Sequence, residues 1–299
     1  MNDYLVKAYA FDKSVRIYGA VTTRLVEEAR MIHDTWPTAT AALGRVLTAT
    51  VIMGAMYKGD QTLSIQIDGG GPIGKIVATT NANGEVRGMV EHPHIQLSTA
   101  DGKLAVGKAV GNSGFIHVTK DLKIRDIFTS SASLRTGEIG DDFTYYFAMS
   151  EQIPSAVGLG VLVGEDNRAL ASGGFILQVM PGMKKERLAE IEANIAAMRP
   201  ISELVAAGAS PETLVEAITK GDHEFVEHLD LKYACDCSWD KFANGLVALG
   251  RKELEAMSAE ALPVETVCQF CGKKYAYQLA DLEKIMERAN KEDEAKEKV

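Results

Sequence analysis

The sequence lacks any surplus of positive charge. Its 299 residues include 32 Lys and Arg against 41 Asp and Glu, which gives a formal net charge of −9. Nucleic-acid backbones and anionic membrane surfaces are both bound through clustered positive charge. The composition therefore argues against a general nucleic-acid binder and against a protein drawn to anionic lipid, and we expect neither partner.

The sequence also lacks a recognisable export signal or membrane-spanning segment. The first ten residues carry Asp3 and Lys7, and no apolar run with a small-residue cleavage site follows them. The most apolar stretch, residues 39–57, is interrupted by Gly44 and Arg45, so we interpret it as a buried helix. We therefore expect a cytoplasmic protein, in a compartment where thiols stay reduced.

Cysteine is absent from the first 234 residues, and the whole chain contains only four. In a reducing compartment, clustered cysteines indicate metal ligands or redox groups rather than structural disulfides. Apolar residues make up 46% of the chain and charged residues 24%. These are ordinary values for a globular protein, so a sizeable core is expected and wholesale disorder is excluded.

Residues 1–182 predict a sheet-rich α+β domain with packed helices. Two apolar runs around the polar turn at residues 12–14 indicate a hairpin, and Gly-rich or Asn-Gly turns separate later short runs. Helices are expected over residues 22–33 and from after Pro37 to near Tyr57. The predicted strands are residues 5–11, 15–21, 63–68, 75–80, 85–91, 115–119, 144–149, 158–163 and 174–180.

Residues 183–232 predict a helical linker. Leu188, Ile191 and Ile195 fall on one helical face, and Pro200 closes that helix. Ser210, Pro211 and Glu212 supply a cap, a first-turn proline and a first-turn acid for another helix. Short helices of modest hydrophobicity obtain most of their stability from docking, so we expect this segment to be metastable.

Residues 233–290 predict a small third unit, followed by a charged, frayed tail over residues 291–299. Ser238 is placed to cap a helix that Gly250 ends. The expected apolar faces are Phe242, Leu246 and Leu249 on this helix and Leu279, Leu282 and Met286 on the last one.

All four cysteines lie in this third unit. Cys235 and Cys237 form C-x-C, and Cys268 and Cys271 form C-x-x-C. Four thiolates suit the tetrahedral preference of Zn²⁺, so we predict one zinc per chain. A four-thiolate site leaves no position for water or substrate, which argues against hydrolytic catalysis and against an enzyme. The site is then either structural or oxidisable, because the thiolate is the reactive form of cysteine.

A comparison of the free energy of zinc binding with that of folding favours a switch controlled by the metal. Structural zinc contributes ~10–16 kcal/mol in small zinc modules, whereas whole domains are stable by only ~5–15 kcal/mol. So small a unit has too little core to survive loss of its metal. Oxidation of the ligand sulfurs is therefore expected to unfold the unit and to weaken whatever docks on it.

At these residues the sequence resembles the 33 kDa chaperonin family, the redox-regulated heat-shock holdases of bacteria. The resemblance covers nearly the whole chain. The segments that carry it are Cys235-Asp-Cys237 with Cys268-Gln-Phe-Cys271, Thr35-Trp-Pro-Thr-Ala followed by Ala42-Leu-Gly-Arg45, Gly69-Gly-Gly-Pro-Ile-Gly74, Asp141-Asp-Phe-Thr-Tyr-Tyr146, Ser150-Glu-Gln-Ile-Pro-Ser155, and Gly173-Gly174 through Gln178 to Pro181-Gly182.

The resemblance implies a protein that is inactive when reduced and loaded with zinc. Peroxide with heat, or hypochlorous acid, would then join Cys235 to Cys237 and Cys268 to Cys271. Zinc would leave, the zinc unit and linker would unfold, and the exposed apolar surface would bind unfolding clients without ATP. The family further implies a homodimer, especially when active, and transfer of clients to ATP-driven chaperones after reduction.

Several weaker patterns have simpler structural interpretations. Gly69–Gly74 resembles a phosphate loop, but a β-like run follows where a helix is required, so we expect a strand connection and no nucleotide. His92 and His94 indicate a surface turn, and Asp141 and Asp142 indicate the start of a turn. The segment 111–114 is not a nucleophile elbow. Of the aromatic residues 145–147, alternation predicts at least one in the core.

Two other functions compete with the holdase. A zinc ribbon that contacts RNA is disfavoured, because residues 232–275 contain six Lys or Arg and six Asp or Glu, a local net charge of zero. A dithiol oxidoreductase would place its C-x-x-C at the start of a helix in a βαβ unit. Here the motif follows the β-like run 263–267, beside a matching C-x-C.

Overall fold

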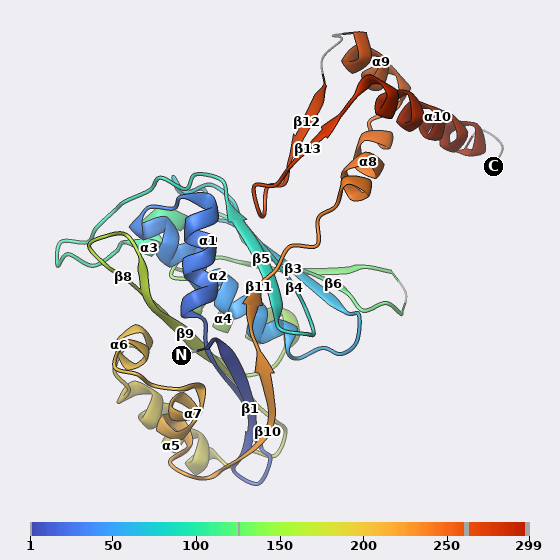
Figure 1. Cartoon of the computed structure of the whole chain (residues 1–299). Helices are drawn as coiled ribbons and strands as arrows, with labels where there is room; N and C mark the ends of the chain where they lie inside the picture. Colours follow the sequence, from blue (N-terminus) through green and yellow to red (C-terminus); the bar gives the residue numbers. More distant parts are fainter. Residues whose placement is uncertain (1, 125, 260–262, 297–299) are drawn as a thin grey trace. The chain divides into compact units, whose positions relative to one another are not determined.

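The computed structural model describes residues 2–124, 126–259 and 263–296. It forms two compact units, Met1–Ala234 and Cys235–Val299, each with its own core (Figure 1). Helices and antiparallel sheets occur together, which confirms the predicted α+β class. Residues 183–232 lie within the first unit, and their behaviour as a metastable linker stays a prediction.

The first sheet has five strands, each antiparallel to its neighbours. In spatial order they are β10 (His223–Asp230), β1 (Tyr4–Ala10), β2 (Val15–Val21), β9 (Ala169–Val179) and β8 (Ser155–Val163). The predicted β1–β2 hairpin is confirmed. It turns through Phe11, Asp12 and Lys13, which all adopt left-handed backbone angles with φ of 52°, 53° and 64°.

The second sheet has six strands and contains most of the other predicted ones. In spatial order they are β11 (Lys232–Tyr233), β5 (Glu85–Val90), β4 (Ile76–Asn81), β3 (Thr62–Asp68), β6 (Phe115–Asp121) and β7 (Phe128–Ser133). All pairs are antiparallel except β11 with β5. Strand β7 was not predicted, because its Thr-Ser-Ser-Ala-Ser sequence carries almost no hydrophobic pattern.

The glycine-rich loop at residues 69–74 connects β3 directly to β4, as predicted. A Cβ at Gly69 would meet the Gly111 carbonyl oxygen at 2.3 Å, and one at Gly71 would meet the Ala109 carbonyl oxygen at 2.3 Å. The glycines are therefore explained by close backbone packing of this loop against residues 109–111.

Helix α2 (Pro37–Gly54) packs between the two sheets, and every residue in it except Arg45 is buried. This burial explains the long apolar run. Helix α1 (Thr23–His33) packs on α2 and on β9. Among the described residues, no helix combines the length and the apolar character that crossing a bilayer requires.

The strand predicted over residues 144–149 is wrong. The segment forms helix α4 (Gly140–Tyr146), which continues as the π-helix η1 (Phe147–Glu151); the short helix α3 (Val106–Val110) was also not predicted. Buried Asp142 accepts backbone N–H groups of Arg135 at 2.6 Å, Thr136 at 3.0 Å and Ile139 at 3.2 Å. This carboxylate fixes the start of the helix, so Asp142 is structural, whereas Asp141 is exposed in the first turn. Tyr146 and Phe147 are both in the core.

Residues 183–232 contain the two specified helices, α5 (Lys185–Ala196) and α7 (Pro211–Thr219), and between them a short helix, α6 (Ile201–Ala206), that the sequence analysis did not single out. Ser210 caps α7 as predicted, accepting the Thr213 N–H. The prediction of helix over residues 223–230 is wrong, because this segment pairs with β1 as strand β10. The partner lies more than 200 residues away, and no local pattern reveals such a pairing.

The second unit consists of α8 (Trp239–Val247), α9 (Arg251–Ala259), β12 (Val264–Val267), β13 (Lys274–Tyr277) and α10 (Leu279–Lys296). Ser238 caps α8 by accepting the Lys241 N–H at 3.2 Å, as predicted. Leu249 and Leu279 are largely exposed, which corrects the predicted faces. The core is formed by Ala243, Leu246, Val247, Leu254, Tyr275, Tyr277, Leu282 and Ile285. Of the predicted frayed tail, residues 291–296 belong to α10 and residues 297–299 lie outside the described residues.

Candidate metal centre

The turn between β12 and β13 positions Cys268 and Cys271. The Cys268 N–H donates to the Lys273 carbonyl oxygen at 2.9 Å, and the Gly272 N–H donates to the Cys268 carbonyl oxygen at 2.8 Å. Gly272 has a φ of 70°, a left-handed angle that favours glycine at this tight turn. This short, doubly hydrogen-bonded turn holds the two sulfurs near one another.

Cys235 and Cys237 lie on the extended segment that leads into α8. The Tyr275 hydroxyl is within hydrogen-bonding distance of both the Cys237 carbonyl oxygen, at 2.9 Å, and the Cys237 Sγ, at 3.2 Å. The Tyr277 hydroxyl donates to the Trp239 carbonyl oxygen at 2.8 Å, and the two rings lie 4.8 Å apart. Strand β13 thereby holds the C-x-C segment against the hairpin.

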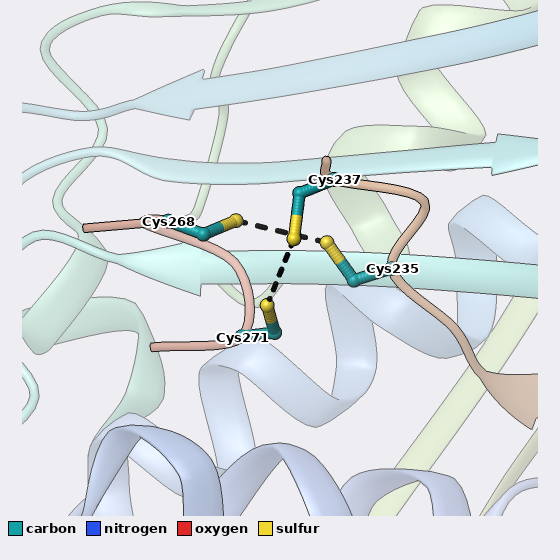
Figure 2. Close-up of side chains that lie close together, drawn as sticks. All are labelled: Cys235, Cys237, Cys268 and Cys271. Atoms are coloured by element: carbon teal, nitrogen blue, oxygen red, sulfur yellow. Dashed lines mark hydrogen bonds between the residues drawn. The ribbon is translucent and has the colours of Figure 1, made fainter. Parts of the chain in front are cut away.

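The four sulfur atoms come together in one cluster (Figure 2). All lie within 4.8 Å of one another; Cys235 and Cys268 are 3.7 Å apart, and Cys237 and Cys271 are 3.4 Å apart. Four sulfurs at ~2.3 Å from a tetrahedral Zn²⁺ lie ~3.8 Å from one another. The donor set and its spacing therefore fit a tetrahedral metal ion, and the structure brings together every predicted site residue.

The environment of the cluster gives its thiols different pKa values. Burial raises the pKa of the Cys271 thiol to about 12 and also raises the pKa of Cys235. Burial acts in the same direction on Cys237, but hydrogen bonds from Tyr275 and the other three thiols outweigh it and lower its pKa to about 7. Among these three thiols, Cys237 is thus the one whose thiolate the protein favours near neutral pH. Keeping several thiolates together requires a cation.

Access to the cluster is partial. Cys268 is buried, with 4% of its surface exposed, whereas Cys235, Cys237 and Cys271 are half-buried. Small oxidants therefore have a route to three of the four sulfurs. Among the described residues, this is the one group of three or more Cys, His, Asp and Glu side chains whose ligand atoms approach closely enough to hold a metal ion.

Sequence reasoning did not single out Tyr275, which contacts a predicted ligand. The alternation in Lys-Tyr-Ala-Tyr at residues 274–277 marks the tyrosines as the inward face of a strand. That signal indicates burial, but not the sulfur contact. The histidines at 92 and 94 lie outside the described metal-ligand cluster: His94 lies on the surface, 3.2 Å from Asp34, in an irregular segment rather than the predicted turn.

Fold and site together define a class of protein, an α+β chain with a separate small unit that gathers four cysteines into a cluster fit for a metal ion. A family model described as Hsp33 protein matches residues 3–278. Two relatives named 33 kDa chaperonin, from Staphylococcus aureus strains Newman and USA300, are 49% identical over 289 residues, 96% of this chain and 98% of theirs. The chain therefore belongs to the Hsp33 family of chaperones.

A solved structure supports the same conclusion. The crystal structure of the 33 kDa chaperonin (heat shock protein 33 homolog) from Thermotoga maritima is 35% identical to this chain and superimposes with a TM-score of 0.88. The match covers 96% of this chain and 98% of that one, so it includes residues of both units. Family membership assigns a chaperone role, and it agrees with the mixed fold described above.

Proposed function

We propose that this protein is a redox-regulated, ATP-independent holdase, silent when reduced and zinc-bound and active when oxidised. The observation that carries the proposal is the convergence of four thiols in a unit that has only a small core of its own. Membership in a chaperone family supplies the class of activity. The cluster supplies a chemical trigger, because its sulfurs are oxidisable.

Cys235, Cys237, Cys268 and Cys271 would hold one zinc ion per chain. A soft, all-sulfur donor set favours zinc over the hard cations that prefer oxygen. Bound zinc supplies cohesion between the C-x-C segment and the β12–β13 turn. Because the four thiolates fill a tetrahedral shell, no position remains for water, so the zinc is structural and the protein is not an enzyme.

Oxidation would convert the four thiolates into two disulfides. Each disulfide requires two thiolates, one hydrogen peroxide and two protons, and it yields two molecules of water. We propose the pairs Cys235 with Cys237 and Cys268 with Cys271, on the strength of the family resemblance. The alternative pairs are also close: the sulfurs of Cys235 and Cys268 are 3.7 Å apart, and those of Cys237 and Cys271 are 3.4 Å apart. Disulfide mapping by mass spectrometry must therefore separate the two patterns.

Loss of zinc would unfold the second unit, because its core is small, with eight buried apolar side chains among the described residues. Unfolding would then pass along the chain to the preceding segment, residues 183–232. Ala234 is the last residue of the first unit and directly follows β11, and its N–H donates to the carbonyl oxygen of Val86 on β5. Release of zinc would thus unfold the second unit, which directly follows β10 and β11 in the chain.

The preceding segment covers an apolar face of the first sheet. Its helices α5, α6 and α7 pack there over β1, β2, β8 and β9. The buried residues of this layer are Val6, Ala8, Ala10, Phe11, Val15, Ile17, Phe175 and Leu177 from the sheet side, and Ile191, Ile201, Ala209, Leu214, Val215 and Ile218 from the helix side. Release of the helices would expose both faces, and unfolding clients bind such apolar surface.

Client release would follow reduction, with transfer to ATP-driven chaperones, and the active form would be a homodimer in the cytoplasm. The oxidoreductase alternative has no support, because Cys268 and Cys271 lie in a turn between two antiparallel strands rather than at the start of a helix. The local charge balance likewise gives the RNA-binding alternative no support.

The test is protection of a chemically denatured client from aggregation, followed by light scattering without ATP. Reduced zinc-loaded protein should not protect, peroxide-treated protein should protect, and re-reduced protein with zinc should again be silent. Equal protection by the reduced and oxidised forms would contradict the proposal. An insulin-reduction assay on the same samples tests the enzyme alternative, and salt-sensitive RNA binding tests the zinc ribbon.

A further inference from the structure

Strand β10 lies at the edge of the first sheet (Figure 1). None of its side chains is buried. Phe225 and Val226 are 41% and 46% exposed. A register shift interrupts its pairing opposite Lys7 and Ala8. The backbone ladder to β1, rather than side-chain burial, therefore holds most of this strand in place.

The direction of that ladder follows from its two ends. The Phe11 N–H donates to the Asp222 carbonyl oxygen at 3.4 Å, and the Leu231 N–H donates to the Asp3 carbonyl oxygen at 3.0 Å. Peptide groups alternate in direction along a strand. The odd-numbered residues of β1 thus direct their N–H and C=O groups at β10, and the even-numbered residues direct theirs at β2.

We propose that, when β10 leaves with the released linker, the freed edge of β1 captures an extended segment of an unfolding client as a new antiparallel strand. This inference rests on the proposed function, since it requires the linker to be released. Its basis is that an unpaired strand edge offers a complete row of donors and acceptors to any extended chain. Backbone recognition of this kind does not depend on sequence, which suits a chaperone with many clients.

Strand β10 itself shows what the edge accepts. Its His228 ring stacks on Tyr4 at 4.6 Å, and its Glu227 lies 3.6 Å from the Lys7 ammonium group. Leu229 packs against the main core. The preferred client segment is therefore extended, free of proline, carries bulky side chains at alternate positions and tolerates an acidic residue opposite Lys7.

The position of the β1 edge in the sheet also favours an extended client segment as its occupant. The even-numbered residues of β1, including Val6, Ala8 and Ala10, belong to the apolar face that α5, α6 and α7 cover. After release of these helices, a strand added at the β1 edge would extend that face by one strand. Its alternate side chains would lie beside exposed apolar surface, so backbone and side-chain binding would act together.

A peptide with the sequence of residues 222–231 provides the test, because it is the native occupant of the edge. The pairs Tyr9 with Glu224, Lys7 with Glu227 and Leu5 with Leu229 are those that exchange backbone hydrogen bonds. One variant is therefore N-methylated at Glu224, Glu227 and Leu229. The matched control is N-methylated at His223, His228 and Asp230, whose N–H groups point away from β1.

With the oxidised full-length protein and a denatured client, the unmodified peptide and the control should both reduce protection, at similar concentrations. The first N-methylated variant should need at least a tenfold higher concentration. Equal potency of the two methylated peptides would overturn the inference. So would a peptide that dissociates a dimer but leaves client protection intact, because the edge would then serve a second copy of this chain.

Amide hydrogen exchange provides a readout without peptides. Oxidation should deprotect the amides of Leu5, Lys7 and Tyr9, and bound client should protect them again. The amides of Val6 and Ala8, which bond to β2, should stay protected throughout. If oxidised protein alone fails to protect clients, the proposed function fails; if it protects while the odd-numbered amides never change, only this inference fails.

Discussion

Gly19 on β2 lies directly beneath Pro211 on α7, so closely that a Cβ on Gly19 would stand 2.7 Å from the Pro211 carbonyl oxygen. The Val215 side chain would lie 3.2 Å from that added Cβ. A single hydrogen in place of a methyl group therefore allows the linker helix to sit on the sheet. This contact permits a test of linker docking that changes neither the linker nor the cysteines.

Gly19→Ala should push α7 away from the sheet at a cost of about 1–3 kcal/mol, the usual range for overpacking. We expect the reduced protein to protect clients partly, and to become fully active at a lower peroxide dose. Light scattering with reduced and partly oxidised protein measures this. Gly174→Ala is the control: its Cβ would meet the Gly158 carbonyl oxygen at 2.6 Å, away from the linker face. If Gly19→Ala loosens residues 183–232 to protease yet stays silent when reduced, linker docking does not control activity.

Tyr275→Phe should make Cys237 a weaker acid in the metal-free, reduced protein. The lost hydrogen bond, 3.2 Å long, is one cause of the low Cys237 pKa of about 7. Such a bond is worth about 1 kcal/mol, or about fivefold in an ionisation constant. Alkylation of Cys237 by iodoacetamide at pH 7, started together with the chelator and measured by peptide mass spectrometry before the unit unfolds, should slow by about threefold, because only about half of Cys237 is ionised at that pH. Tyr277→Phe, which removes a hydroxyl that bonds to Trp239, should leave the rate unchanged.

The same shift has a consequence for pH. Because folding lowers the Cys237 pKa from 9.0 to about 7, the ionised thiolate stabilises the metal-free folded unit above about pH 9. This contribution is lost as the pH falls through 7. The raised pKa of Cys271, about 12, acts in the opposite sense and withdraws stability above pH 9. The fraction of the second unit that stays folded after chelation, followed by circular dichroism, should therefore vary with pH between 7 and 12, and Tyr275→Phe should reduce its rise between pH 7 and 9.

Removal of the metal with a chelator, without any oxidant, should unfold the second unit first. Its small core loses a contribution of ~10–16 kcal/mol, more than such a unit retains. Limited proteolysis should cut within residues 235–288 at once and within residues 183–232 next, while the α2 core persists. Added zinc should restore protection from protease under reducing conditions. An unchanged digestion pattern after complete chelation would show that the metal does not hold this unit together.

Gly245→Ala should stabilise the second unit. Gly245 lies inside α8, has an ordinary helical φ, and a Cβ there would meet nothing within 4 Å. Replacing such a glycine stabilises a helix by about 0.5–1 kcal/mol. Denaturant unfolding of the reduced, zinc-loaded protein should show this gain, and activation should need more peroxide. Gly250→Ala is the matched contrast, because Gly250 has a φ of 84° and its replacement should destabilise the unit.

The cysteine cluster could be predicted because its information is local. The two cysteines of each pair are only two or three positions apart, and four clustered thiols suit a metal ion of tetrahedral preference. The hairpin of β1 and β2 and the buried helix α2 were also predictable, since each depends on a continuous pattern within one segment.

The features that the sequence did not predict share a physical cause: each is determined by tertiary contacts rather than by a local pattern. Strand β10 exists because β1, at the opposite end of the chain, offers it a ladder. Helix α4 begins where a buried Asp142 collects three backbone N–H groups, and the aromatic run that follows looked like a strand. The contact of Tyr275 with Cys237 depends on how the hairpin meets the C-x-C segment, which no spacing specifies.

The most direct test measures bound zinc and client protection on the same samples along a peroxide titration. The account predicts that zinc falls from one ion per chain to none as protection rises from none to full, with the two curves superimposed. Reduction with added zinc should reverse both together. Protection that is complete while zinc remains bound, or zinc that leaves without any gain in protection, would contradict it.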